Sequence, residues 1–328
     1  MTTIAYELRR RRGLPLPSRR VVARLGALAV TLVFGALFVR DGSLQHAWSA
    51  AMTLPLWTVA AALASIGAAM WFTALRWRIL LAGAGADAPL GRLFAALATG
   101  AAANNVLPAR GGDLVRIAAV RETAPKAAIV GTLAAERLLD GVTLALLIVL
   151  GTLISGAGAP LLAIGLALAA ATAAGLLVAT RLSPAALERL APLLPRRMRT
   201  RGLSLASGFA GGLPPLRSPW LLTRALGASF ALWLCDVAMY GAVAAGFHLP
   251  LGVGGWFLLE GIGNLALAVP ATAAGAGTFD YLTLLGVRGL GIGSAAASAY
   301  VLTIHALVVL PATILGALLA RSALRGAR

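Results

Sequence analysis

The chain has 328 residues, of which 59% are hydrophobic and only 12% are charged. Soluble domains carry about 25% charged residues, so the composition excludes an ordinary soluble globular protein. The apolar residues fall in continuous runs of about 20 rather than in alternation, which favours membrane-spanning helices over a β-barrel. We therefore predict an all-α polytopic membrane protein.

The formal net charge is +17, and all of the 28 basic residues except Lys126 are arginines. Such a charge often indicates nucleic-acid binding, but here the basic residues cluster beside apolar runs. The positive-inside rule accounts for this pattern, so we expect no nucleic-acid partner and assign the basic clusters to the cytoplasmic side. Twenty of the 28 lie in the stretches 1–24, 76–92, 181–219 and 321–328.

In chain order, a basic cytoplasmic arm (1–21) precedes a single membrane domain (22–320) and a basic cytoplasmic tail (321–328). The arginine- and proline-rich stretch 181–219 is typical of a cytoplasmic interfacial segment. Six apolar stretches are suited to full spans. The predicted spans are 22–39, 54–75 (closed by Arg76 and Arg78 inside), 127–154, 160–180, 221–246 and 292–320.

Two further apolar segments, 93–126 and 253–291, are interrupted by glycine and proline and are too short to cross twice. The basic clusters place both ends of the first segment on the cytoplasmic side and both ends of the second on the outer side. We therefore predict two re-entrant helical hairpins that enter from opposite faces. Span, hairpin, span occurs twice in opposite orientation, which is the pattern of an inverted-repeat transporter with a midplane site.

The tip of the first hairpin is a polar segment in an otherwise apolar region. A proline there ends a helix and frees backbone carbonyls, and a glycine permits close backbone approach. Its arginines suit a phosphate group, and its aspartate could balance one of them. The segment is either an anion site for a lipid phosphate or a structural, salt-bridged turn. Its candidate residues are Asn104, Asn105, Pro108, Arg110, Gly112, Asp113 and Arg116.

Glu136, Arg137 and Asp140 crowd one side of the helix predicted over 127–154, because their spacings are i, i+3 and i+4. Three ionisable groups inside a span are costly if they face lipid, so we expect them to face the protein interior. They form either part of a polar substrate or proton path or a purely structural pairing.

The second hairpin carries a loosely similar pattern, with one proline, two glycines and an acid. We favour a functional role for its acid, Asp280. The remaining ionisable groups in apolar runs are proton carriers or structural partners, and the sequence leaves both readings open. The second-half candidates are Asp236, Glu260, Pro270, Gly275, Gly277, Asp280 and His305. The sequence has no metal-ligand constellation, nucleophile elbow or nucleotide-binding loop, so we expect no cofactor and no enzymatic activity.

Over residues 70–320 the chain resembles the membrane region of lysylphosphatidylglycerol synthases, also called the flippase-like family. The first shared motif comprises Asn105, Pro108, Ala109, Arg110, Gly112, Asp113 and Arg116. The second comprises Glu136, Arg137 and Asp140, and the third Pro270, Gly275, Gly277 and Asp280, where the family has glutamate. The chain departs from the family at Ala273 and Ala274, which replace a proline and a glycine, and at His305, where an arginine is common.

The resemblance implies a lipid translocase of the bacterial inner membrane, with anionic membrane lipids as partners, and the basic arm and tail predict that both termini are cytoplasmic. Its cargo would be an anionic phospholipid, a polyprenyl-phosphate-linked lipid or a hopanoid-type lipid. The alternatives are a proton-coupled small-solute transporter and a non-transporting membrane component of an envelope-lipid pathway. Fused family members carry a soluble aminoacyl-transfer domain that this sequence does not show, so we expect no synthase activity. The sequence is compatible with a homodimer.

Overall fold

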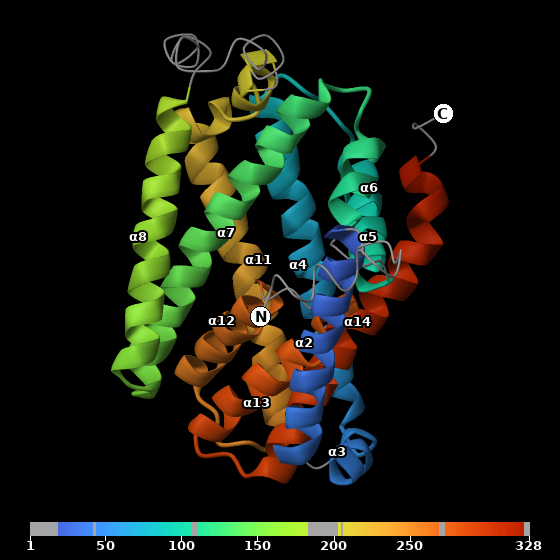
Figure 1. Ribbon diagram of the computed structural model, residues 1–328, viewed down its shortest axis with the longest axis vertical. Helices are drawn as coiled ribbons and strands as arrows, with labels where there is room; N and C mark the ends of the chain where they lie inside the picture. The colour runs from blue at the N-terminus through green and yellow to red at the C-terminus, as the bar shows by residue number, and fades with distance from the viewer. Residues whose placement is uncertain are drawn as a thin grey trace, which may run out of the picture.

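The computed structural model describes residues 19–41, 44–106, 111–182, 203–204, 206–268 and 273–324, and every regular element within them is helical (Figure 1). The long helices are α2 (Arg19–Asp41), α4 (Leu56–Gly83), α7 (Lys126–Ser155), α8 (Ala159–Arg181), α11 (Pro219–Gly246) and α14 (Ser294–Leu324). The shorter elements are α3 (Leu44–Ala51), α5 (Leu90–Val106), α6 (Gly112–Ala119), η2 (Pro214–Arg217), α12 (Val253–Ala268), η3 (Ala273–Gly275) and α13 (Thr278–Gly289).

Five of the described helices are long and apolar enough to cross a membrane, namely α4, α7, α8, α11 and α14. Large apolar side chains such as Leu153, Val178 and Leu318 lie exposed on them. Exposed apolar surfaces of this kind promote aggregation in water, whereas they are expected where a helix contacts lipid. The chain is therefore an integral membrane protein, and five of the six predicted spans correspond to these helices. The sixth predicted span, 22–39, is helical within α2, and its crossing of the membrane stays a prediction.

The predicted end of the second span was wrong. We expected the span to close at residue 75, with Arg76 on the cytoplasmic surface. Instead α4 continues to Gly83, because the apolar residues after Arg78 extend the buried face, and Leu80 is fully buried. Arg76 is consequently only 3% exposed and lies inside the protein, whereas Arg78 remains exposed.

The two predicted hairpin segments each contain a pair of short helices. α5 packs against α6, and α12 packs against α13. Figure 1 shows the two pairs toward opposite ends of the long axis of the molecule. The stretches 107–110 and 269–272, which join the helices of each pair, lie outside the described residues. The entry of each pair from one membrane face stays a prediction.

We divide the membrane domain into a first half, α4 to α7, and a second half, α11 to α14. A long helix of each half packs against the helix pair of the other half. α5 lies along α14, α12 lies along α7, and α4 lies along α11 between them. Glycines allow the closest crossings: a Cβ atom at Gly151 would lie 2.6 Å from the backbone nitrogen of Leu258. Similarly, Gly316 lies against the backbone of α5, where Thr99 Oγ1 donates to the Gly316 carbonyl over 3.3 Å. The two helix pairs are therefore fixed by long helices that are distant in sequence.

The predicted interfacial segment 181–219 lies largely outside the described residues. Its described end contains η2, where the Arg217 guanidinium donates to the carbonyl of Leu182 at the end of α8. This contact joins the end of α8 to the start of α11.

Candidate functional site

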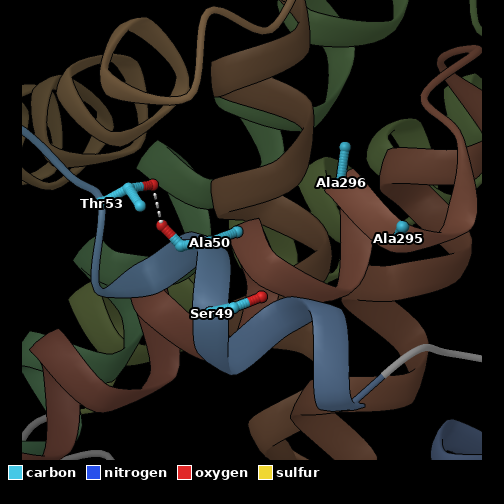
Figure 2. Close-up of a pocket in the computed structure, with 5 residues that line it drawn as sticks. All are labelled: Ser49, Ala50, Thr53, Ala295 and Ala296. Atoms are coloured by element: carbon cyan, nitrogen blue, oxygen red, sulfur yellow. Dashed lines mark hydrogen bonds between the residues drawn. The ribbon is translucent and has the colours of Figure 1, made fainter.

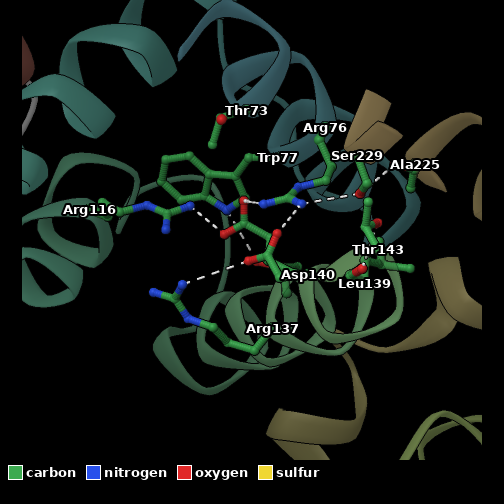
Figure 3. A network of polar contacts seen from close by, with 12 residues as sticks. Thr73, Arg76, Trp77, Arg116, Arg137, Leu139, Asp140, Thr143, Ala225 and Ser229 are labelled. Carbon is green, nitrogen blue, oxygen red and sulfur yellow. Dashed lines mark hydrogen bonds and ion pairs between the residues drawn. The ribbon is translucent and has the colours of Figure 1, made fainter. Parts of the chain in front are cut away.

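Three arginines and three acids from α4, α6 and α7 form one network of ion pairs, as Figure 3 shows for part of the set. Their formal charges balance. We call this set the charge cluster, and its members are Arg76, Asp113, Arg116, Glu136, Arg137 and Asp140. The predicted second motif on α7 and the described part of the first motif on α6 are thus brought together by the fold.

Glu136 is the buried centre of the charge cluster. Its Oε2 accepts from Arg116 Nη2 over 2.5 Å, and its Oε1 lies 3.5 Å from Arg76 Nη2. Arg76 Nη1 also donates to Asp140 Oδ1 over 2.5 Å and to Ser229 Oγ over 3.1 Å. One helical turn separates Glu136 from Asp140, so both carboxylates face the same guanidinium. The inner part of the cluster is therefore a set of buried, paired charges that joins α4, α6, α7 and α11.

Arg116 is held on a second side by an aromatic ring. Its guanidinium carbon lies 4.3 Å from the ring centroid of Trp77, which is a cation–π contact. The indole N–H of Trp77 donates to Thr132 Oγ1 over 3.3 Å, which fixes the ring. Arg116 is itself buried. It therefore anchors α6 to α4 and α7, and is poorly placed to contact a ligand.

Arg137 is the exposed member of the charge cluster, with 56% of its side chain accessible. Its contacts are long: Nη2 lies 3.5 Å from Asp113 Oδ2, and Nη1 lies 3.7 Å from Asp140 Oδ2. Exposure thus rises from the buried Arg76–Glu136 pair outward to Arg137. Within the described residues of this cluster, Arg137 is the guanidinium that an anion can reach with least rearrangement. Pro108 and Arg110, two further predicted site residues, lie outside the described residues.

The two predicted site asparagines hold the first helix pair in place. Asn104 Oδ1 accepts from the backbone N–H of Gly112 over 2.8 Å, which joins α5 to α6. Asn105 Nδ2 donates to the Val309 carbonyl over 3.2 Å and to Thr313 Oγ1 over 3.0 Å, which joins α5 to α14. Both amides therefore have a defined packing role beside the charge cluster.

We expect Gly112→Ala to destabilise the protein by about 2 kcal/mol, because the new methyl group overpacks the crossing of α5 and α6. A Cβ atom there would overlap the carbonyl group of Gly100 and lie 2.8 Å from Asn104 Cγ. Thermal unfolding in detergent micelles measures the loss. Gly91→Ala in α5 is the control, since its Cβ would meet nothing within 4 Å. Equal melting temperatures for the two variants would contradict the close crossing.

In the second half, the predicted residues form a separate site at the start of α13. Asp280 Oδ2 accepts from the backbone N–H of Gly277 over 2.9 Å, and Asp280 Oδ1 lies 2.6 Å from His305 Nδ1. Gly275 and Gly277 have φ angles of 70° and 83°, which supports the predicted turn. Pro270 lies outside the described residues.

The two other predicted acids lie on α11 and α12. Glu260 on α12 is buried, and its Oε1 accepts from Asn264 Nδ2 one turn along the same helix over 2.6 Å. Asp236 on α11 is half-buried. The partner shown for Glu260 is thus an amide of its own helix.

Sequence reasoning missed Arg76 and Trp77 as members of the site. Arg76 was interpreted as a topology marker because it follows a long apolar run. One signal was available: Glu136 and Asp140 place two acids in the span, and only Arg137 accompanies them there. A second internal cation was therefore needed, and Arg76 lies in an apolar stretch that continues to Gly83.

A pocket of about 350 Å³ lies elsewhere, between α3 and the start of α14 (Figure 2). Its lining residues are Ser49, Ala50, Thr53, Ala295 and Ala296, and the Thr53 hydroxyl donates to the Ala50 carbonyl over 2.8 Å. None of these residues is charged or an acid–base group at neutral pH.

A model of one protein family, described as "Lysylphosphatidylglycerol synthase TM region", matches residues 24–316. The match covers both helix pairs and the charge cluster, and it extends beyond the predicted resemblance to include most of α2. The family resemblance is thereby confirmed. Comparison with curated proteins finds no match.

Proposed function

Because the chain belongs to the family of lysylphosphatidylglycerol synthase membrane regions, a family of membrane components of lipid pathways, we propose that it moves a lipid with an anionic headgroup across the bilayer. The cargo class is an anionic phospholipid, a polyprenyl-phosphate-linked lipid or a hopanoid-type lipid with an anionic headgroup. The observation that carries the proposal is the position and exposure of Arg137.

Arg137 lies 11 residues after Lys126, which is the first residue of α7. At 1.5 Å per residue this places it about 17 Å along a candidate membrane span. An arginine that faces lipid at such a depth costs about 2.5–3.5 kcal/mol or more. More than half of its side chain is nevertheless exposed. A phosphate-bearing headgroup would give this exposed guanidinium shorter contacts than its two long ion pairs, since the guanidinium fork matches phosphate oxygens in pairs.

The other members of the charge cluster fit a supporting role. Arg76 and Arg116 lie behind Arg137 and are neutralised by acids, and Glu136 holds both of them in place. The long contacts of Arg137 with Asp113 and Asp140 can be exchanged for shorter contacts with an anion. In this proposal Arg137 contacts the headgroup, while Arg116 is a positioning residue.

The packing pattern supports the predicted inverted repeat. In an inverted repeat, the helices α4 to α7 correspond in order to α11 to α14. The contact of α5 with α14 then corresponds to the contact of α12 with α7, and both contacts are present. In each half a pair of ionisable side chains also joins the second short helix to the following long one, Arg116 to Glu136 and Asp280 to His305. We propose that the two helix pairs are re-entrant hairpins of opposite orientation, as in transporters with a midplane site.

The proposal places the protein in a bacterial inner membrane with cytoplasmic termini, on the distribution of its basic residues. Its partners are membrane lipids. It includes no enzymatic step, because translocation needs binding and movement but no covalent change in the lipid.

We expect Arg137→Gln to slow headgroup translocation at least about tenfold, which corresponds to about 1.4 kcal/mol of lost interaction. The measurement uses proteoliposomes with fluorescent phosphatidylglycerol and an external quencher that reports lipid reaching the outer leaflet. Fluorescent phosphatidylcholine provides the comparison, since it carries no net charge. Arg78→Gln is the matched control, because Arg78 is an exposed arginine of α4 that follows the buried Arg76.

Equal rates for wild type and Arg137→Gln would overturn the headgroup role, provided that both proteins melt at the same temperature. Uptake of a small solute driven by a pH gradient, without faster lipid movement, would instead favour the transporter alternative.

A further inference from the structure

We propose that Asp280 and His305 form a binding site for one proton, and that this proton fastens the turn before α13 to α14. The inference goes beyond lipid translocation and does not depend on the cargo. It rests on the hydrogen-bond geometry of three groups: the Asp280 carboxylate, the His305 ring and the carbonyl of Ala274.

Both ring nitrogens of His305 lie within hydrogen-bond distance of an oxygen. Nδ1 is 2.6 Å from Asp280 Oδ1, and Nε2 is 3.1 Å from the Ala274 carbonyl oxygen. The second carboxylate oxygen of Asp280 is already occupied, because it accepts from the backbone N–H of Gly277 over 2.9 Å. The ring therefore bridges α14 to both α13 and η3.

The two hydrogen bonds of the ring require one more proton than a neutral histidine and an ionised aspartate carry together. A carbonyl oxygen only accepts, so the contact with Ala274 requires a proton on Nε2. The contact with Asp280 requires a second proton between Nδ1 and Oδ1. Neutral imidazole carries only one N–H. The pair must therefore be an imidazolium with a carboxylate or a neutral ring with a protonated carboxyl group, and both forms hold the same extra proton.

Loss of that proton has a definite structural consequence. The single remaining N–H of His305 can serve Asp280 or Ala274 but not both. Hydrogen bonds to a charged acceptor are stronger than those to a neutral one, so the N–H stays with the carboxylate. The carbonyl of Ala274 then loses its donor. The tie between the turn and α14 is thus present at low pH and is lost as the pH rises.

The backbone conformation of this turn has to be stabilised by contacts such as the hydrogen bond from His305. Ala274 has φ 59° and ψ 9°, a left-handed conformation that is unfavourable for a residue with a Cβ atom. Gly275 and Gly277 also have positive φ angles, but as glycines they bear no such penalty. A turn strained at Ala274 keeps this shape only while surrounding contacts hold it, and His305 supplies one of them.

Asp280 is the ionisable group placed to control the protonation of His305. The ring also packs against Phe279, with centroids 5.0 Å apart, and its side chain is 15% exposed. Several charged and titratable groups on the neighbouring helices have partners of their own. Arg116 of α6 and Arg76 of α4 contact Glu136, and Glu260 of α12 contacts Asn264. Tyr281 of α13 donates to Asp41, and Tyr300 of α14 donates to the Tyr240 carbonyl of α11. Asp236 of α11 and Arg288 of α13 are further charged residues on these helices. The sequence of α5 from Leu93 to Val106 contains no charged residue, and the side chain of His46 on α3 lies outside the described part of the chain.

The first test observes the proton directly in the wild-type protein. The chain contains three histidines, so selective ¹⁵N labelling of histidine gives a simple spectrum, and the His305→Gln variant assigns the His305 signals. In lipid nanodiscs between roughly pH 5 and pH 9, the range over which histidines titrate, we expect the signals of the His305 ring to show one titration. A His305 ring that stays neutral, with ¹⁵N signals that do not change over the whole pH range, would overturn the proposal.

The second test asks whether this proton holds the turn. Amide hydrogen exchange of a peptide that spans 273–277, corrected for the intrinsic effect of pH, should become about fivefold faster above the titration, as expected for loss of one hydrogen bond. In His305→Gln the corrected exchange should no longer depend on pH. His248→Asn is the control, because His248 is exposed and has a positive φ angle that asparagine tolerates. Corrected exchange that does not change through the His305 titration would overturn the role of the proton.

Discussion

Glu136→Gln should destabilise the protein by about 3–5 kcal/mol, because it removes a negative charge that is shared by two buried guanidiniums. Of its acidic partners, Arg116 would keep Asp113, at 3.6 Å, and Arg76 would keep Asp140. Glutamine can accept a hydrogen bond but cannot neutralise either arginine. The expected result is a markedly lower melting temperature in detergent and poor recovery of folded protein.

The control for this variant is Glu122→Gln, which breaks the pair of the exposed Glu122 with the half-buried Arg92 at 3.6 Å and should cost less than about 1 kcal/mol. A double variant provides the sharper test. Glu136→Gln combined with Arg116→Gln removes one buried cation together with the anion, so it should be more stable than the sum of the two single effects predicts. Strict additivity would show that Glu136 and Arg116 do not interact in the folded protein.

Gly277→Ala should destabilise the protein by about 2–5 kcal/mol, because strain and overpacking act at the same position. The φ angle of Gly277 is 83°, which a residue with a Cβ atom adopts only at a cost. In addition, the Cβ atom would lie 2.7 Å from the Thr31 carbonyl oxygen and 2.9 Å from the Gly35 nitrogen, both in α2. Thermal unfolding measures the total loss.

Gly85→Ala separates the two causes. Gly85 has a similar φ angle of 78°, and its Cβ would meet nothing within 4 Å, so only the strain remains. The difference between the two variants therefore reports the packing of α2 on the turn before α13. If the two variants lose the same stability, then α2 does not rest on this turn in solution.

Much of the fold followed from the sequence alone because it depends on local properties. A long run of apolar residues forms a helix in lipid whatever its neighbours are, since every backbone group must be bonded within the segment. For this reason α7, α8, α11 and α14 begin and end close to the predicted limits. The glycines at 275 and 277 likewise marked a turn correctly, because φ angles of this kind strongly favour glycine.

The roles of the charged residues depended on contacts that the sequence does not encode locally. The i, i+4 spacing placed Glu136 and Asp140 on one side of α7, but which arginine meets them is set by how the helices are rotated and packed. Arg76 joins them across 60 and 64 residues of chain. Only the assembled helices buried Arg76 and Arg116, left Arg137 exposed, and used Asn104 and Asn105 as packing contacts.

The sequence by itself thus determined a helical membrane protein, its family, and the three motifs that carry its charges. The tertiary structure decided which charges neutralise one another, and it alone placed His305 between Asp280 and the Ala274 carbonyl. The physical reason is one of range. Helix formation and turn geometry are settled within a few residues, whereas the partner of a buried charge is settled by surfaces that meet only when the whole chain has packed.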